Sequence, residues 1–510
     1  MSLRAASLAV LLAASTLAVG CASQAADDAT SDGAITSNDG SVLELKLTGK
    51  VIAAKDTPAR QAIVAQLQYT QGILTTDARG NGQVGMVSLA DVVETTSGDQ
   101  KTITYSAALP VVWPKYSTPP ATYDLSLPLD VTKLDTFNAK YDGKCGTNEY
   151  GRETFWHDFN PKASGCALDA ADVHATKATV AKHPKTTQGK YPEYDKVWAD
   201  DSLDVVGVFG IISSNTPSDE GAREMETFLT EAGRALEGAK RTDNRATSSI
   251  IKDATVTGKV KVAGRDRTVT VTGILVESVD GTGRDFDDRY GPLSEKADLL
   301  VYSGHSGLGK NINALAAKGK VAKGKYQLVY LNGCQSFAYL GTAMHDKHTA
   351  ANGKDVDPDG TKYLDVVANA LPAYGDDGAT SLTLYRAMLD FGGRPKTYNQ
   401  LLEDFSSIHL VAVFGEDGPW CSSTKGQTGH TLGTAGALEA VLSALALERA
   451  FNYRSNADIV DLARVAGYPA TLQPAHPDLR VAWAQAPAAG ARPPRWPASG
   501  CRWSRPAGHR

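Results

Sequence analysis

His305 and Cys334 are the two residues whose chemical types and positions most clearly suggest chemistry. Each follows directly on a glycine, at the end of the short stretches 298–304 and 326–333, which have apolar cores. Buried parallel strands have such apolar cores. In open α/β sheets, reactive groups gather at the carboxyl ends of the strands. A thiol and an imidazole delivered to one edge form a candidate nucleophile and base.

Each of the two residues also has a plainer interpretation. Cysteine is among the most frequently buried residue types, so Cys334 alone would be a structural thiol at a strand end. His305 alone would be a polar cap on a loop. Their occurrence together, each after glycine at the end of a strand, favours a site with a nucleophile and a base. A non-catalytic protein with the same arrangement of strands is the main alternative.

The surrounding sequence predicts the elements that would position this pair. Residues 203–212 and 268–276 have the composition of strands, 280–297 of a helix, and 364–371 of a further strand. Ser218 is expected to cap a helix with a continuous apolar face. Alternation of strands and helices predicts an α/β domain over 201–417, with a mostly parallel sheet and helices on both faces.

The motifs at 303–305 and 332–336 resemble those of the caspase-like cysteine peptidases, which include caspases, gingipains and CHAT-domain proteases. Residues 366–389 are similar to the CHAT order of strand, proline, acidic pair, threonine and helix. The resemblance implies a caspase-like fold, with no cofactor and with a peptide or protein as substrate. Cys334 would attack the peptide carbonyl as thiolate, and His305 would protonate the leaving amine.

The resemblance also implies where the oxyanion would be held. Backbone N–H groups of Ser306, Gly307 and Cys334 are the expected donors. The family usually has glycine directly after the histidine, and this chain has Ser306 there.

Two other motifs overlap or follow this region. Residues 304–311 match the Gly-x4-Gly-Lys pattern of phosphate-binding loops, but Asn311 stands where Ser or Thr would bind magnesium. A P-loop nucleoside triphosphatase is therefore the weaker alternative. Residues 355–360 begin like a calcium loop, yet Val366 occupies the position of the essential Glu. Because some relatives bind calcium, a surface calcium site is kept as a hypothesis, with no metal ligands assigned.

The N-terminus has the pattern of an export signal. Arg4 precedes an apolar run over 5–19, which is too short to span a bilayer. Residues 17–21 resemble a bacterial lipobox, which implies a signal peptide over 1–21 and lipidation of Cys21. The absence of Asp after Cys21 favours an outer-membrane lipoprotein of the cell envelope. A plain secretory signal is the alternative, and residues 22–40 read as a flexible linker.

Charge and cysteine content bound the partners and the compartment. The 510 residues carry a net charge of −5, so nothing electrostatic indicates nucleic acid. The membrane is expected as a partner only through the lipid anchor. In an oxidising compartment Cys145 and Cys166 are the natural disulfide pair, worth roughly 3 kcal/mol. That pairing would leave Cys334 without an obvious partner, with Cys421 as its main competitor.

The remaining regions complete the expected organisation. Alternating short stretches, including 63–69, predict a β-sandwich-like module over 41–134, followed by an irregular connector over 135–200. Residues 420–449 resemble a β-ketoacyl synthase motif in which Lys425 and His430 match catalytic residues. We treat 418–510 as a synthase-like fragment with an irregular tail. One hypothesis is that the reading frame is interrupted near 418, and the alternative is an ordinary helical extension.

Overall fold

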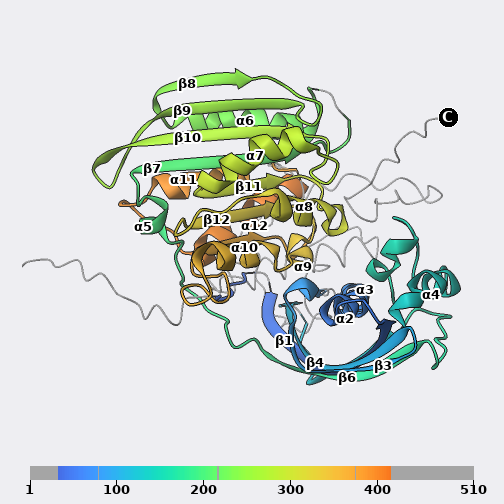
Figure 1. Cartoon of the computed structure of the whole chain (residues 1–510). Coiled ribbons are helices and arrows are strands. Elements are labelled where there is room, and N and C mark those ends of the chain that lie inside the picture. Colours follow the sequence, from blue (N-terminus) through green and yellow to red (C-terminus); the bar gives the residue numbers. More distant parts are fainter. Residues whose placement is uncertain are drawn as a thin grey trace, which may run out of the picture.

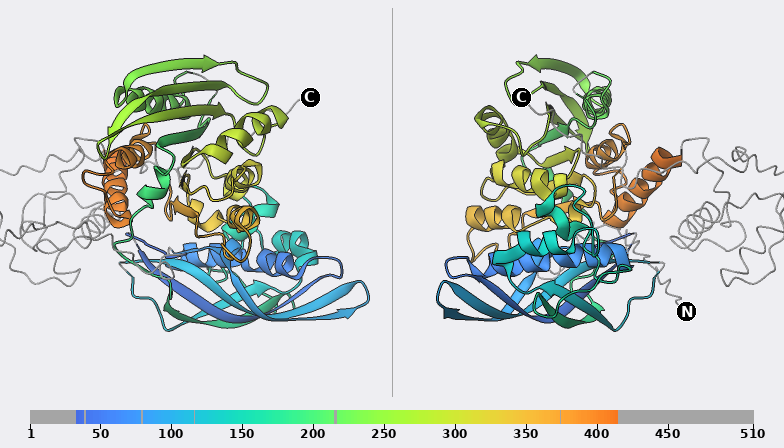
Figure 2. Two further views of the ribbon diagram at one scale, coloured as in Figure 1. Left: turned by 60° about the vertical axis from the view of Figure 1, so that its left-hand side comes forward. Right: turned by 90° about the vertical axis from the view of Figure 1, so that its right-hand side faces the viewer.

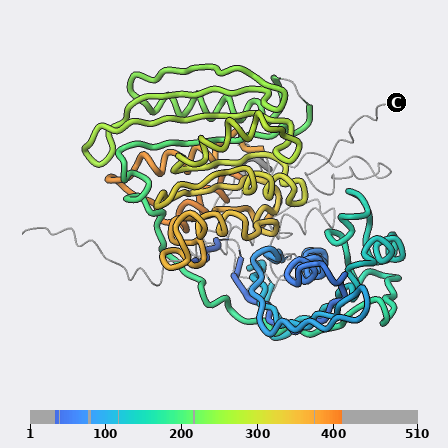
Figure 3. The backbone as a smooth tube through the Cα atoms, in the orientation of Figure 1, coloured from blue at the N-terminus to red at the C-terminus, as the bar shows by residue number. Residues whose placement is uncertain are grey.

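The computed structural model describes residues 33–38, 40–78, 80–115, 117–214, 217–373 and 375–414. They form two parts, which we call the N-terminal module (residues 40–182) and the α/β domain (residues 202–414) (Figure 1). A linking segment, residues 183–201, runs along the side of the molecule from one part to the other (Figure 3).

The N-terminal module is built on a single six-stranded antiparallel sheet, in the order β2-β4-β1-β6-β5, with β3 paired to β4. Its strands are β1 (Gly40–Ala54), β2 (Asn81–Gly82), β3 (Ser88–Ser97), β4 (Gln100–Pro114), β5 (Thr122–Pro128) and β6 (Val173–Lys182). The long ladder between β1 and β4 runs from the pair Gly40 and Pro114 to the pair Ala54 and Gln100. This ladder forms the backbone of the module.

The expected sandwich is wrong, because helices rather than a second sheet cover the inner face. Helices α2 (Ala59–Leu67), α3 (Tyr69–Ala78) and α4 (Leu134–Tyr141) lie between the sheet and the α/β domain (Figure 2). The stretch 63–69 looked like an alternating strand, but most of it lies in α2. Ile63 and Leu67 are both fully buried at helical spacing. A short apolar stretch fits either period, and tertiary packing decided between them.

The segment 135–200 is more ordered than expected. It contains α4, the 3-10 turn η3 (Arg152–His157), β6 and the short helix α5 (Tyr194–Val197). Strand β6 pairs with both β1 and β5, so it belongs to the sheet. The predicted disulfide between Cys145 and Cys166 is confirmed. Of the predicted linker over 22–40, residues 22–32 and 39 lie outside the described residues, and only its end is corrected, since Ile35 bridges to Thr186 and β1 begins at Gly40.

The α/β domain has a seven-stranded sheet in the order β13-β12-β11-β7-β10-β9-β8. Its strands are β7 (Ser202–Gly210), β8 (Glu237–Asn244), β9 (Lys252–Val262), β10 (Arg265–Val276), β11 (Leu299–Ser303), β12 (Gln327–Asn332) and β13 (Leu364–Ala368). The five strands from β13 to β10 are parallel, whereas β9 and β8 are antiparallel additions at one edge. The predicted mostly parallel sheet is therefore present, with an unpredicted antiparallel edge.

Helices cover both faces of this sheet, as expected. One buried cluster joins it to α6 (Glu220–Arg234), α11 (Ala379–Leu389) and α12 (Tyr398–Phe414). The opposite cluster joins it to α7 (Arg284–Lys296), α8 (Lys310–Lys318) and α10 (Ala343–Asn352). The cap of α6 is Asp219 rather than the predicted Ser218. None of the described helices is both long and apolar enough to cross a membrane.

A buried polar network fastens the linking segment to the edge strand β13. Lys190 Nζ lies 2.7 Å from Asp365 Oδ1, and both side chains are largely buried. The hydroxyls of Tyr326 and Tyr398 donate to Asp365 Oδ2 at 2.7 and 2.6 Å. Both oxygens of the buried Asp365 carboxylate have partners, so the network holds the linking segment against β13 in one defined position.

Candidate active site

His305 and Cys334 lie at the same edge of the α/β sheet. Strands β11 and β12 are parallel neighbours, and Ser303 at the end of one is in register with Asn332 at the end of the other. Each reactive residue follows its strand by two positions, after Gly304 or Gly333. The expectation that the two strands deliver both side chains to one edge is therefore met by the backbone.

The imidazole of His305 is held by a backbone carbonyl on a third strand end. Its Nε2 lies 2.9 Å from the carbonyl oxygen of Ile212, two residues beyond β7. A carbonyl oxygen only accepts hydrogen bonds, so Nε2 carries the proton and Nδ1 carries the lone pair. His305 therefore has one nitrogen committed to orientation and the other available as a base.

The carboxylate of Asp219 fixes the turn that carries Ile212. It accepts backbone N–H groups of Ile212, Ser213 and Ser214 at distances between 2.8 and 3.2 Å, together with the N–H of Gly221. Burial works to raise the pKa of Asp219, but these N–H donors outweigh it and lower the pKa. Sequence reasoning named Ser218 as the helix cap, and it missed both the capping role of Asp219 and the link of this carboxylate to the imidazole.

The loop after His305 is tied down from both sides. The backbone carbonyl oxygen of His305 accepts hydrogen bonds from the Tyr302 hydroxyl at 2.6 Å and from Asn311 Nδ2 at 2.8 Å. The amide oxygen of Asn311 accepts the N–H of Asp280 at 3.0 Å. Since both ends of the Asn311 amide are engaged within the fold, this residue is not disposed to act as a metal ligand. That geometry weakens the phosphate-loop interpretation of 304–311.

Cys334 lies directly after β12, in a segment that consists of a tight turn and the short helix α9 (Ser336–Tyr339). We call this segment, residues 333–339, the Cys334 turn. The sulfur of Cys334 is half-buried and lies 3.7 Å from the carbonyl oxygen of Ala373. The next residue, Gln335, has a φ of 49°, a left-handed conformation that is uncommon outside glycine. Strained backbone of this kind gathers at functional sites.

The sulfur of Cys334 belongs to a disulfide in this structure. Its partner is not among the described residues, where Cys145 and Cys166 are bonded to each other. The expectation that Cys334 would lack a partner is therefore corrected. A thiolate at this position requires prior reduction.

Ser306 joins the two reactive loops directly. Its hydroxyl donates to the carbonyl oxygen of Cys334 at 2.6 Å, and the residue is almost fully buried. A Cβ atom at Gly333 would lie 2.6 Å from the Ser306 hydroxyl oxygen, so only glycine fits there. The oxyanion role expected for the backbone N–H groups of Ser306, Gly307 and Cys334 stays a prediction.

A buried acidic layer lies beneath the strand ends. Glu224 of α6 is almost fully buried, and burial together with the negative charge of Asp376 raises its pKa to about 8. Its carboxyl group is bonded to Ser303, the last residue of β11. Asp376 accepts the N–H and the hydroxyl of Thr380 at 3.1 and 2.5 Å. The sequence offered no signal that Glu224, Ser303 and Asp376 would lie together, because they come from three separate segments.

In the loop 355–360, for which a calcium site stays a hypothesis, the first described feature is the position of Asp357. Asp357 is buried, and it accepts Asn352 Nδ2 at 3.3 Å and the N–H of Lys362 at 3.1 Å. Within the described part of the chain, no group of three His, Cys, Asp or Glu side chains is placed to hold a metal ion.

Comparison with known families links a short segment of the chain to one enzyme domain. The model of the beta-ketoacyl synthase C-terminal domain matches residues 407–454, under a tenth of the chain. The match begins within α12, and the rest, with Lys425 and His430, lies outside the described residues, as does Cys21. The resemblance read from 420–449 is thus confirmed as a short segment. No curated protein matches the chain.

Proposed function

We propose that the reduced protein is a caspase-like cysteine endopeptidase that uses Cys334 as nucleophile and His305 as base and acid. The observation that carries this proposal is the placement of both residues two positions beyond adjacent parallel strands. Chemistry in open α/β sheets concentrates at that edge. The loops are further joined by the bond from Ser306 to the Cys334 carbonyl.

The proposed reaction follows from the roles of the two side chains. His305 Nδ1, left with its lone pair by the bond from Nε2 to Ile212, accepts the thiol proton. The thiolate attacks the peptide carbonyl, and the imidazolium returns its proton to the leaving amine. Water then hydrolyses the thioester, which regenerates the thiol. Nearby backbone N–H groups would stabilise the oxyanion.

Reduction is a condition of this proposal. The disulfide at Cys334 blocks the nucleophile, so hydrolysis is expected only with a reductant. The test is hydrolysis of a peptide library with varied P1 residues by the full chain, with and without reductant. Cys334→Ala should abolish hydrolysis, whereas Cys145→Ala, which removes a different disulfide cysteine, should retain it wherever the protein stays folded. Hydrolysis that persists in Cys334→Ala would refute the mechanism.

The disulfide also favours a second candidate. A cysteine held permanently as a disulfide is a structural element, and the chain would then be a non-catalytic envelope protein that uses this fold for binding. The two candidates differ in one measurement. A reduced wild-type protein that hydrolyses no member of the library, while Cys334 is demonstrably alkylated, supports the binding protein.

We further propose that the chain is exported and anchored through a lipid on Cys21. The disulfide between Cys145 and Cys166 supports an oxidising compartment, where such bonds persist. Cys21→Ala should abolish incorporation of labelled fatty acid and release the protein from the membrane fraction. Unchanged fractionation and labelling in that variant would contradict the anchor.

A further inference from the structure

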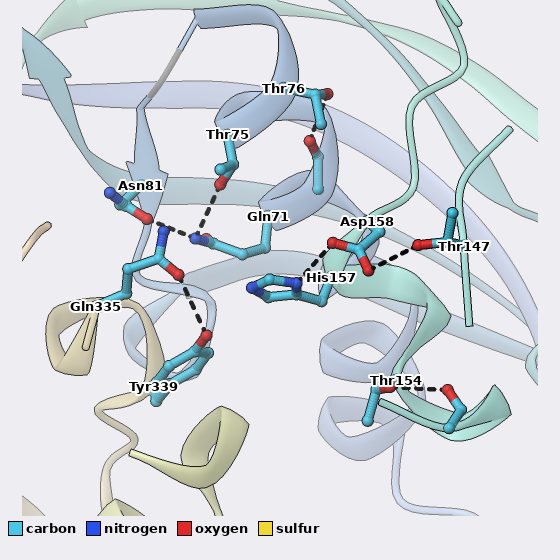
Figure 4. Close-up of polar contacts among 12 residues, drawn as sticks. Gln71, Thr75, Thr76, Asn81, Thr147, Thr154, His157, Asp158, Gln335 and Tyr339 are labelled. Atoms are coloured by element: carbon cyan, nitrogen blue, oxygen red, sulfur yellow. Dashed lines mark hydrogen bonds and ion pairs between the residues drawn. The ribbon is translucent and has the colours of Figure 1, made fainter. Parts of the chain in front are cut away.

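The N-terminal module contacts both segments that enclose Cys334. One is the Cys334 turn, and the other is the loop after β13, residues 369–373, which we call the flanking loop. The module reaches the flanking loop through Asn81 of β2 and the Cys334 turn through Trp156 of η3. Figure 4 shows Gln335 and Tyr339 of the α/β domain beside Asn81 and Gln71 of the module.

The amide of Asn81 has a defined orientation. Its oxygen accepts Gln71 Nε2 at 2.6 Å, and the oxygen of Gln71 in turn accepts the N–H of Gly82 at 3.1 Å. The NH2 group of Asn81 is therefore directed to the carbonyl oxygen of Ala370, to which it donates a hydrogen bond. Asn81 and Gln71 are both buried, so neither bond is exchanged readily for water.

The flanking loop passes this constraint to the Cys334 turn. The carbonyl oxygen of Leu371 accepts the N–H of Gln335 at 3.0 Å, and that of Asn369 accepts the N–H of Phe337 at 3.1 Å. The Ala373 carbonyl lies against the sulfur itself. The hydrogen bond from Asn81 to Ala370 therefore fixes the loop between Asn369 and Leu371, the two residues that bind the backbone of the Cys334 turn.

The N-terminal module also contacts the C-terminal end of the Cys334 turn. The rings of Trp156 and Tyr339 meet edge to face, with centroids 6.3 Å apart. A Cβ atom at Gly85 would lie 2.7 Å from the backbone at Gly341, so the backbone of the module closely approaches the backbone just beyond the Cys334 turn. The left-handed Gln335 lies between these contacts and the flanking loop. Such a conformation persists only where its surroundings over-determine it.

We propose that Asn81 is a positioning residue, through which the N-terminal module holds the flanking loop and the Cys334 turn in the reactive arrangement. The site is then complete only with the module in place. Its catalytic meaning rests on the proposed function, but the positioning is measurable without any substrate.

Asn81→Asp tests this directly in the reduced full-length protein. The introduced carboxylate keeps the acceptor for Gln71 but sets an oxygen against the Ala370 carbonyl. Asn81→Ala removes the donor without adding charge. Lys185→Met is the control, because Lys185 of the linking segment makes an exposed contact with Asp359 of the α/β domain, at 3.9 Å, away from the Cys334 turn. The readouts are amide hydrogen exchange and the pH profile of Cys334 alkylation by iodoacetamide.

We expect both Asn81 variants to raise exchange at the amides of Gln335 and Phe337 about tenfold. The alkylation profile should move to higher pH, because the thiol loses the position that the proposed pairing with His305 requires. In Asn81→Asp the effect should diminish at acidic pH, where the introduced carboxyl is protonated and donates again. Lys185→Met should match the wild type in both readouts.

Unchanged exchange and alkylation in both Asn81 variants would overturn the proposal, as would an equal effect of Lys185→Met. These outcomes do not depend on hydrolysis. A wild-type protein without peptidase activity that still shows the Asn81 effect would refute the proposed function and leave the positioning intact.

Discussion

The hydroxyl of Ser306 donates to the carbonyl oxygen of Cys334 at 2.6 Å, across 28 residues of sequence. Ser306, which directly follows His305, therefore holds the backbone of Cys334. Because Ser306 is buried, the bond has no ready replacement by water.

Ser306→Ala should destabilise the protein by about 1 to 2 kcal/mol, since it leaves the Cys334 carbonyl without this donor. Urea denaturation measures the change. Ser407→Ala is the control, because among the described residues the exposed Ser407 hydroxyl donates to its own helix, at the Glu403 carbonyl. Its effect should stay below about 0.5 kcal/mol. Equal effects of the two substitutions would show that the Ser306 bond contributes little.

His305→Ala should shift the pH profile of Cys334 alkylation in the reduced protein toward higher pH, by about one unit or more. A neighbouring imidazolium stabilises a thiolate, and its removal makes the thiol harder to ionise. The control is His174→Ala, in β6 of the N-terminal module, which should leave the alkylation profile unchanged. A profile that does not move in His305→Ala would show that the two side chains are not coupled.

Stability should fall as pH rises from about 5 to about 8, in part because of Glu224. Its pKa of about 8 in the folded state lies above the ordinary value of 4.5, so the folded protein holds a proton that the unfolded chain releases. The contribution is fully present below pH 4.5 and is lost as pH rises through 8. Its slope is at most about 1.4 kcal/mol per pH unit.

Glu224→Gln should remove that slope, because the side chain stays uncharged. Glu226 on the same helix is a matched control. Its bond to Arg241 lowers its pKa, so its contribution changes only at acidic pH. Glu226→Gln should therefore retain the wild-type slope between pH 5 and 8. Urea denaturation across this range decides the matter, and parallel curves for wild type and Glu224→Gln would contradict the burial argument.

Replacing both Cys145 and Cys166 by alanine should lower the free energy of unfolding by about 3 kcal/mol, because the disulfide restricts the unfolded chain. Thermal and urea unfolding without reductant measure the loss. Wild-type stability that is equal to that of the double variant under oxidising conditions would show that the bond contributes nothing.

Several features of the fold follow from local sequence patterns. The apolar stretches before His305 and Cys334 predicted two buried strands, and their alternation with helices predicted a mostly parallel sheet. The spacing of Cys145 and Cys166 suggested their disulfide. These predictions held because each depends on residues close together in the chain or on a general rule of sheet topology.

The N-terminal module shows where local patterns are insufficient. Residues 63–69 fitted a strand, yet Ile63 and Leu67 are buried in a helix against a single sheet. Strand β6 was missed because its burial alternates weakly, and its place depends on pairing with β1 and β5. Pairing partners far apart in sequence decide such cases, and no local period encodes them.

The sequence by itself determined that a thiol and an imidazole end two neighbouring strands of an α/β domain. Only the tertiary structure decided what surrounds them: the Ile212 carbonyl on the imidazole, buried Glu224 with its raised pKa, and Asn81 of the N-terminal module against the flanking loop. The physical reason is that strand ends are specified by local hydrophobic pattern. Hydrogen bonds and burial depend instead on which distant segments the folded chain brings together.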